Sequence, residues 1–241
     1  MSPEPQESEA VQPIATIEDP RAITLLTTEH WSLLSARSLA YNEAFVRAGM
    51  FLTFLSASFV ALALVAQAMS FERDFITIAA VVLAFDFVVG LASFGRINGA
   101  NLDDLRANHG MARIRHAYTQ ITPLVAPYFT TPTHDDLDTV TTVYGPISDR
   151  MVGQFFYGLT TSSGMIGLIV AMVGGVLTAV VATLLSLDGG TSLWIGIGGG
   201  VLIFVALFAY TGLAIQKAYG QFTSLFPTPG PHPVEQAPDQ P

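Results

Sequence analysis

Residues 48–69 read AGMFLTFLSASFVALALVAQAM, a run without any charged side chain. A helix needs about 20 predominantly apolar residues to cross the hydrocarbon core of a bilayer, so this run predicts a transmembrane helix. Residues 151–187 and 189–216 are also uncharged, and residues 75–94 carry only Asp86. The sequence therefore predicts an all-α, polytopic membrane protein with four transmembrane helices.

The uncharged run at residues 151–187 is longer than one span requires. Its 37 residues are too few for two spans and a turn, which need more than about 40 residues. We therefore expect one span there, preceded by a helical lead-in at residues 151–159. The four expected spans form two hairpins with short outer turns, and they lie at about residues 48–69, 75–94, 160–187 and 193–216.

The distribution of lysine and arginine predicts the orientation, because these residues are retained on the cytoplasmic side of a membrane. Nine of the ten Lys and Arg residues fall on one side of the expected spans, and Arg73 alone falls on the other. Both termini are therefore expected in the cytoplasm. The start of the chain is acidic, unlike a secretory signal, so we expect the first span to stay as an anchor in a multi-pass protein of the plasma membrane.

The chain divides into two tails, two hairpins and a central segment. Both tails are rich in proline and polar residues and have little apolar surface to bury, which predicts disorder. The expected segments are a disordered tail at residues 1–20, a cytoplasmic helix with the first hairpin and the following helix at residues 21–122, a cytoplasmic connector at residues 123–150, the second hairpin at residues 151–225 and a disordered tail at residues 226–241.

The cytoplasmic part before the first span is expected to be helical. A cap at residues 27–29 predicts the start of a helix that continues from Thr28 to Met69. Mostly apolar residues recur along this helix at spacings of three or four, which places them in one stripe. The stripe consists of Trp31, Leu34, Ser38, Tyr41 and Phe45.

The central segment predicts two further helices. The first spans residues 102–122 and is broken by Pro123 and Pro127, and the second opens at a cap in residues 133–136 and ends near Tyr144. A segment of this size is too small to bury a core of its own. We therefore expect it to pack on the N-terminal helix.

Composition and motifs argue against several classes of function. The net charge is −9, whereas nucleic-acid binding needs clustered Lys and Arg. Without cysteine there is no disulfide framework, thiolate nucleophile or Cys-based zinc site. No catalytic triad pattern, zinc-protease motif or phosphate-binding loop occurs, so we expect no catalytic residue, metal or cofactor. The acids next to His134 fit a helix cap better than a metal site, because adjacent positions point to different sides of a helix.

Asp86 is the only charged side chain within an expected span. An ionised carboxylate at this depth costs at least about 2.5 kcal/mol, so it should face protein or water. It could act as a proton or cation relay, or it could be a structural residue held by a hydroxyl of the first span. The candidate hydroxyls belong to Thr53, Ser56 and Ser58. The structural interpretation is favoured, because a relay usually has further charged partners within the membrane.

Small residues recur every four positions in the last two spans. This spacing lets helix backbones approach closely and predicts packing within the second hairpin, with a seam between subunits as the less favoured alternative. The residues are Ser163, Gly167, Ala171 and Gly175 in the third span and Gly196 and Gly200 in the fourth.

A further candidate surface lies on the first central helix, where it leaves the membrane. Two arginines and two histidines share one helix face. This face could contact anionic lipid headgroups, or it could be a solvated face balanced by Asp103 and Asp104; the sequence favours neither. The residues are Arg106, His109, Arg113 and His116.

The segment at residues 29–47, EHWSLLSARSLAYNEAFVR, leads into the first span. With this segment, residues 28–120 resemble uncharacterised bacterial integral membrane proteins built from paired transmembrane hairpins. Their order of helix, hairpin and helix is also similar in layout to two-span effector domains of bacterial defence systems. The resemblance implies a bacterial membrane protein and no particular activity.

Three functions remain, in order of preference. The first is a non-enzymatic plasma-membrane protein that lies in the lipid bilayer and acts through association, with itself or with another membrane protein, using its cytoplasmic helices. The second is an oligomeric transporter or pore that uses Asp86. The third is a membrane enzyme or a membrane effector of the defence type.

Overall fold

A computed structural model describes residues 17, 19–69, 72–144 and 158–229 of the chain. These residues form helices and no strands: α1 (Pro20–Met69), α2 (Arg73–Ile121), η1 (Pro123–Tyr128), α3 (Leu137–Thr141), η2 (Thr142–Tyr144), α5 (Ser162–Leu184) and α6 (Gly189–Gly220). Each of the four long helices contains a stretch long and apolar enough to cross a membrane. This confirms the prediction of an all-α protein with four such helices. Most of the expected lead-in (residues 151–157) and most of the expected tails (residues 1–16 and 230–241) lie outside the described residues.

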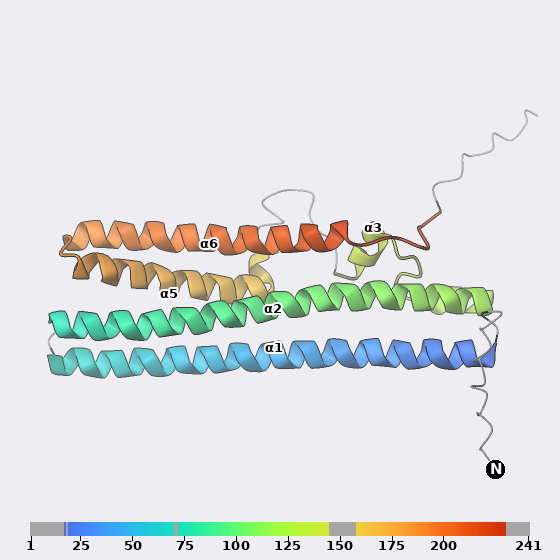
Figure 1. Cartoon of the computed structure of the whole chain (residues 1–241), viewed down its shortest axis with the longest axis horizontal. Coiled ribbons are helices and arrows are strands. Elements are labelled where there is room, and N and C mark those ends of the chain that lie inside the picture. Colours follow the sequence, from blue (N-terminus) through green and yellow to red (C-terminus); the bar gives the residue numbers. More distant parts are fainter. Residues whose placement is uncertain (1–16, 18, 70–71, 145–157, 230–241) are drawn as a thin grey trace, which may run out of the picture.

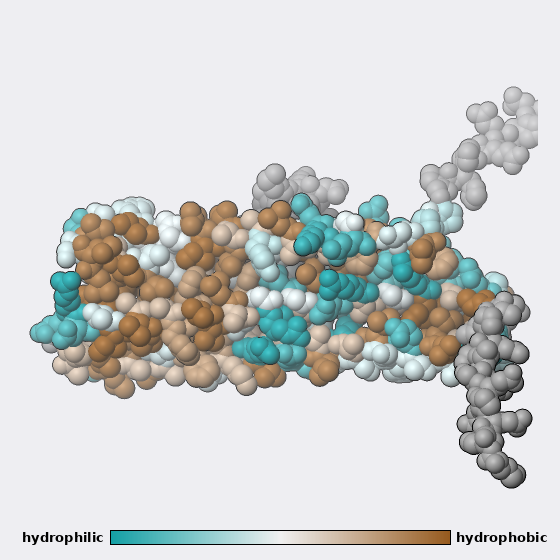
Figure 2. Space-filling view, in the orientation of Figure 1, coloured by the Kyte–Doolittle hydropathy of each residue, from teal (hydrophilic) through white to brown (hydrophobic). Residues whose placement is uncertain are grey.

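The long helices lie side by side in the order α1, α2, α5, α6 (Figure 1). α1 packs along α2, α5 packs along α6, and α2 also packs against α5. The end of α1 that leads into α2 and the end of α5 that leads into α6 lie at the same end of the molecule. Apolar side chains dominate the surface next to that end, while polar side chains gather in the half that contains α3 (Figure 2).

α1 begins earlier than the sequence predicted. Pro20 occupies the first turn, where its missing N–H costs nothing, and the Asp19 carboxylate accepts a backbone hydrogen bond two residues further on, at 2.8 Å. Thr28 does not cap the helix, because its hydroxyl donates to the Thr24 carbonyl at 2.8 Å. The predicted start at residues 27–29 is therefore wrong: an upstream acid and proline start the helix first.

Proline ends α2 where the sequence predicted. The second expected span and the first central helix are one continuous helix that ends at Ile121, before Pro123. Pro123 and Pro127 then lie within the short 3-10 helix η1. A short tight helix tolerates proline at its start, because the first N–H groups of a helix have no internal partner.

Small residues let α1, α2 and α5 approach one another closely. Ala44, Ala48 and Phe51 are buried in the cluster that α1 forms with α2 and α5. The Phe51 ring lies against Gly90 of α2, where an added Cβ would be 2.9 Å from the ring and 2.8 Å from Val170 of α5. Position 90 therefore requires glycine, because a side chain there would collide with both neighbouring helices.

Helices α3, α5 and α6 each begin with a side-chain cap. The capping residues are Asp136, Thr161 and Asp188, and each accepts a hydrogen bond from the N–H three residues further on, at 2.9 to 3.1 Å. Such a bond satisfies an N–H group that has no partner within the first turn. The cap predicted in residues 133–136 is confirmed at Asp136.

Candidate functional site

Asp86 lies in α2 and is completely buried. The Ser58 hydroxyl of α1 donates a hydrogen bond to Asp86 Oδ1 at 3.1 Å. The other two candidate partners, Thr53 and Ser56, donate to carbonyl oxygens of their own helix. Asp86 thus joins α1 to α2 through one hydroxyl, as the structural interpretation requires.

We expect Asp86→Asn to fold as stably as the wild type, because the amide keeps an oxygen for the Ser58 hydroxyl and carries no charge. Asp86→Leu should lower the free energy of unfolding by about 1 kcal/mol, since the hydroxyl loses its acceptor. Thermal unfolding in detergent compares the two variants. A proton or cation flux in liposomes that is lost in a stably folded Asp86→Asn protein would show a relay instead.

Part of the small-residue stripe on α5 faces α2 and not α6. An added Cβ at Gly167 would lie 3.0 Å from the Phe94 ring of α2. The Ser163 hydroxyl accepts a hydrogen bond from Asn101 of α2 at 3.3 Å. The expectation that these two residues pack against the fourth span is therefore wrong, because α5 lies between two helices and its faces divide between them.

The rest of the stripe contacts α6. An added Cβ at Gly175 would lie 2.9 Å from the Gly196 carbonyl oxygen and 3.1 Å from the Gly200 Cα. An added Cβ at Gly200 would lie 3.3 Å from the Ala171 carbonyl oxygen. The two backbones are therefore in direct contact along this part of α5 and α6.

Gly175→Leu is expected to lower the free energy of unfolding by about 3 kcal/mol, at the upper end of the cost of overpacking, because backbone atoms of α6 block the side chain. Gly198→Leu is the matched control, since an added Cβ at this α6 glycine meets nothing within 4 Å. Thermal unfolding of both variants in detergent measures the difference. Equal losses of stability would show that the close contact at Gly175 does not matter.

The face of Arg106, His109, Arg113 and His116 is not one exposed surface. Arg106 is exposed and pairs with Asp103 at 3.0 Å. His109 is buried, and Arg113 and His116 contact the chain that precedes α3 or follows α6. Neither interpretation left open by the sequence, a four-residue headgroup face or a solvated face, describes these residues, because three of the side chains contact other parts of the protein.

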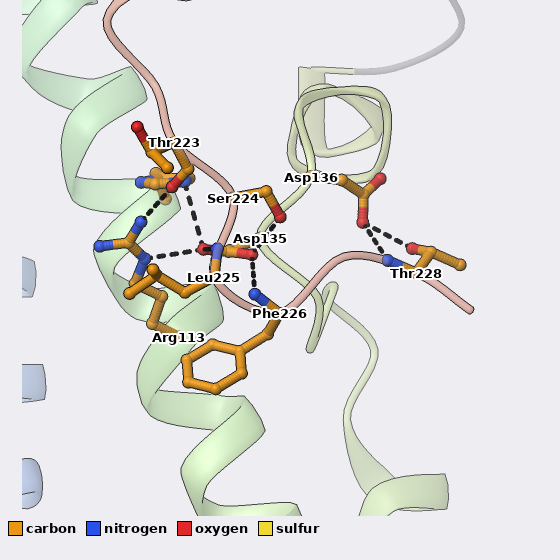
Figure 3. A network of polar contacts seen from close by, with 9 residues as sticks. Arg113, Asp135, Asp136, Thr223, Ser224, Leu225, Phe226 and Thr228 are labelled. Carbon is orange, nitrogen blue, oxygen red and sulfur yellow. Dashed lines mark hydrogen bonds and ion pairs between the residues drawn. The ribbon is translucent and has the colours of Figure 1, made fainter. Parts of the chain in front are cut away.

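Asp135, just before α3, holds the chain that follows α6. Its carboxylate accepts a hydrogen bond from Arg113 of α2 at 2.7 Å (Figure 3). It also accepts three hydrogen bonds from the segment after α6, at 2.7 to 2.9 Å. The donors in that segment are the Ser224 hydroxyl and the N–H groups of Leu225 and Phe226. One buried carboxylate thus connects α2, α3 and the chain after α6.

Asp136 binds the same segment a little further along. It accepts hydrogen bonds from the N–H and the hydroxyl of Thr228, at 2.9 and 2.6 Å (Figure 3). Residues 226–229 were expected to belong to a disordered tail, and the structure instead ties them to the two acids. We name the set of Arg113, Asp135, Asp136 and residues 223–228 the C-terminal clasp.

Both acids of the C-terminal clasp are ionised. Burial raises the pKa of Asp135, but hydrogen bonds from the segment after α6 and from Arg113 outweigh burial and hold the pKa well below its usual range. Burial also raises the pKa of Asp136, and bonds from two threonines bring it down to about 2. Burial and the charge of Arg113 lower the pKa of His109, so this neighbour is neutral and Arg113 is the cationic partner of the clasp.

A second buried acid, Asp104 of α2, joins α1 and η2. Asp104 is 1% exposed and forms an ion pair with Arg37 of α1, whose side chain is 31% exposed. The Tyr144 hydroxyl of η2 donates to Asp104 Oδ2 at 2.7 Å, and Asn108 donates to the same oxygen at 3.3 Å. Burial and the bond to Asp104 raise the pKa of Tyr144, so the phenol stays protonated and donates. These contacts tie the polar part of α1 to α2.

The apolar stripe expected on α1 is not the face that packs on α2. Trp31 is 62% exposed, Phe45 is 51% exposed and Leu34 is 39% exposed. Tyr41 is half-buried and stacks on Phe45, with the ring centroids 5.9 Å apart. The face that packs on α2 instead contains Ala44 together with Leu33, whose side chain lies against Gly110 of α2. Large apolar side chains outside the expected span therefore remain at the surface.

Sequence reasoning missed the ion pair of Arg37 with Asp104 and the anchoring role of Asp135. Each acid has an acidic neighbour in sequence, and a helix or turn directs adjacent side chains to different sides. The sequence did contain a sign that Arg37 points inward, because Arg37 lies on the same face of the helix as the buried Ala44. The same kind of signal distinguishes Asp104 from the exposed Asp103, because Asp104 lies in helical phase with Ile97 and Met111.

No group of three or more His, Asp or Glu side chains in the described part of the chain is placed to hold a metal ion. The chain matches no protein-family model, no curated protein and no solved structure. The function therefore has to be inferred from the exposed stripe, the two buried acids and the apolar helices.

Proposed function

We propose that this chain is a multi-pass protein of the bacterial plasma membrane, with α1–α2 and α5–α6 as two transmembrane hairpins and both termini in the cytoplasm. The four long apolar helices support this placement, as does the nine-to-one distribution of Lys and Arg. In this placement the polar parts of α1, α2 and α6 form a cytoplasmic module together with α3. The ion pair of Arg37 with Asp104 and the C-terminal clasp hold this module together.

The cytoplasmic module acts through association with another protein, and the exposed stripe on α1 carries this proposal. Large apolar side chains that gather on a water-exposed surface mark protein interaction sites. The stripe residues follow alternating steps of three and four, which is the spacing of a coiled-coil seam. The exposed members are Trp31, Leu34, Ser38 and Phe45, and the half-buried Tyr41 lies at the edge of the stripe nearest Asp104 of α2.

The stripe fits a second copy of the same chain. Two copies in one membrane have the same orientation, so their α1 helices run parallel. The spacing of the stripe is compatible with a parallel coiled coil. A two-fold axis along the membrane normal then places each stripe residue opposite its own equivalent. Anchoring in one membrane raises the effective concentration of the two copies, which compensates for the short length of the seam.

Single cysteines test this contact, because the chain has no cysteine of its own. In Trp31→Cys, an oxidant added to isolated membranes is expected to cross-link two copies into a dimer. Glu29→Cys is the matched control, since Glu29 is also exposed and lies about 200° away around the same helix turn. Both cysteines should react with a membrane-impermeant maleimide only after the cells are opened.

The outcomes separate the two parts of the proposal. Equal cross-linking of Trp31→Cys and Glu29→Cys, or no cross-linking of either, would contradict association of two copies through the stripe. Labelling of either cysteine in intact cells would contradict the cytoplasmic placement of α1. A dimer mass in detergent that Trp31→Ser converts to a monomer mass would support association independently.

A further inference from the structure

A cavity of about 520 Å³ lies between α2, α5 and α6, and Tyr41 of α1, Thr141 of α3 and Tyr144 of η2 also line it. It lies where α5 begins at Ser162, while α2 and α6 on either side of it continue for several more turns (Figure 1). The volume falls within the range of about 300–1,000 Å³ that is typical of small-molecule sites.

The part of the cavity nearest the apolar half of the molecule is lined by aromatic and aliphatic side chains. Phe94 of α2 and Phe204, Leu207 and Phe208 of α6 line this part. All four residues belong to the apolar stretches that we place in the membrane. This part of the cavity therefore suits a hydrocarbon chain and lies at the depth of one.

Next to this apolar part, uncharged polar side chains line the cavity. The Thr211 hydroxyl of α6 donates to Asn98 of α2 at 3.0 Å, and Asn101 of α2 donates to Ser163 of α5 at 3.3 Å. These bonds hold amide and hydroxyl groups of three helices around the cavity. A carboxamide has two N–H donors and a carbonyl acceptor, so Asn101 keeps capacity for a ligand after its bond to Ser163.

No described residue that lines the cavity is charged. Sites for anionic headgroups at a cytoplasmic membrane surface contain Lys or Arg, because phosphate binding depends on charge-assisted hydrogen bonds. Among the described lining residues, the polar groups beside the apolar part are amides, hydroxyls and phenols. Its chemistry therefore fits a polar group that exchanges hydrogen bonds and carries no charge.

We infer that this cavity binds a single-chain lipid with an uncharged, hydroxyl-bearing head, of which a monoacylglycerol is the simplest example. The chain lies among Phe94, Phe204 and Phe208, and the head hydroxyls exchange hydrogen bonds with Asn101 and Ser163. The inference rests on the proposed membrane placement, and it does not depend on association through the α1 stripe.

Binding to the purified full-length protein in detergent tests the class of ligand. Three probes with the same acyl chain are compared by native mass spectrometry: a monoacylglycerol, the free fatty acid and a lysophospholipid. The monoacylglycerol is expected to bind tightest. Tighter binding of the fatty acid or of the lysophospholipid would overturn the assignment of an uncharged head, and equal binding of all three would show that only the chain is recognised.

Two glycines of α6 give a matched pair of variants. An added Cβ meets nothing within 4 Å at either Gly212 or Gly198, so both positions accept a leucine. Gly212 lines the cavity and Gly198 does not. Gly212→Leu is expected to weaken monoacylglycerol binding by at least about tenfold, because its side chain takes space that the ligand needs, while Gly198→Leu leaves binding unchanged. Equal affinities of the two variants would overturn the inference.

Two further measurements keep the result interpretable. Thermal unfolding without ligand shows whether both variants fold, and a photoreactive monoacylglycerol maps the site in the wild type. Cross-links in residues 94–105, 158–167 or 204–219 support the cavity, whereas cross-links confined to residues that do not line it overturn the inference. Cross-linking of Trp31→Cys in the same preparation reports association separately, so failure of one proposal is distinguishable from failure of the other.

Discussion

Arg37→Met is expected to lower the free energy of unfolding by about 3 kcal/mol, the lower end of the cost of breaking a buried ion pair. Asp104 is 1% exposed and would lose its cationic partner. The lower end applies because the Arg37 side chain is 31% exposed, so solvent screens part of the interaction. Methionine preserves much of the packing of the aliphatic part of the arginine side chain. The loss of stability therefore reflects the removed charge. Denaturant unfolding in detergent, followed by helix content, measures it.

Two controls identify the cause of this loss. Arg106→Met removes a neighbouring arginine whose pair with Asp103 is exposed, so its cost should stay below about 1 kcal/mol. The double variant Arg37→Met with Asp104→Asn removes both charges and keeps an acceptor for the Tyr144 hydroxyl. It should recover more than half of the lost stability. A double variant as unstable as Arg37→Met would refute the electrostatic explanation.

Asp135→Asn is expected to release the chain after α6, with a loss of about 3 kcal/mol in unfolding free energy. The carboxylate accepts from Arg113 and from three groups of that chain. The asparagine side chain would turn its own N–H groups toward some of these donors, and those donors would then have no acceptor. Protease cleavage within residues 222–229 should rise sharply. Asp138→Asn, at an exposed acid three residues away, should leave cleavage unchanged.

Acid should release the C-terminal clasp in the same way. The pKa values of Asp135 and Asp136 in the folded protein lie below the ordinary value of 3.8. A carboxyl whose pKa is lower in the folded than in the unfolded protein stabilises the fold fully at pH values above its unfolded-state pKa. This stabilisation is lost as the pH falls through the folded-state pKa. Cleavage should therefore stay constant above about pH 4 and rise toward the Asp136 pKa of about 2. A rise centred near neutral pH would instead implicate His109.

The small-residue stripe of α5 shows how far spacing carries a prediction. Ser163, Gly167 and Gly175 lie four or eight positions apart, which predicts that α5 has a face where another helix approaches closely. The structure divides this face between two helices, since Gly167 meets Phe94 of α2 and Gly175 meets α6. The spacing of small residues along one helix predicts that another helix approaches closely. It does not predict which helix that is.

The α1 stripe shows the complementary limit. Its spacing predicts one apolar face, and the usual expectation is that such a face packs inward. In the structure the inward face is a different one that contains Ala44, Ala48 and Phe51, while Trp31 remains exposed. Spacing predicts that a helix has an apolar face, but the neighbouring helix decides which face is covered.

The sequence by itself determined the helical class, the four long apolar helices, the proline that ends α2 and the cap at Asp136. These features depend on side chains within one turn or one run of the chain, so composition and spacing are sufficient to predict them. Only the tertiary structure decided which groups bind Asp104 and Asp135, which helix each small residue meets and where the chain after α6 is held. Each of these depends on residues that are far apart in sequence, and no local pattern records which of them become neighbours.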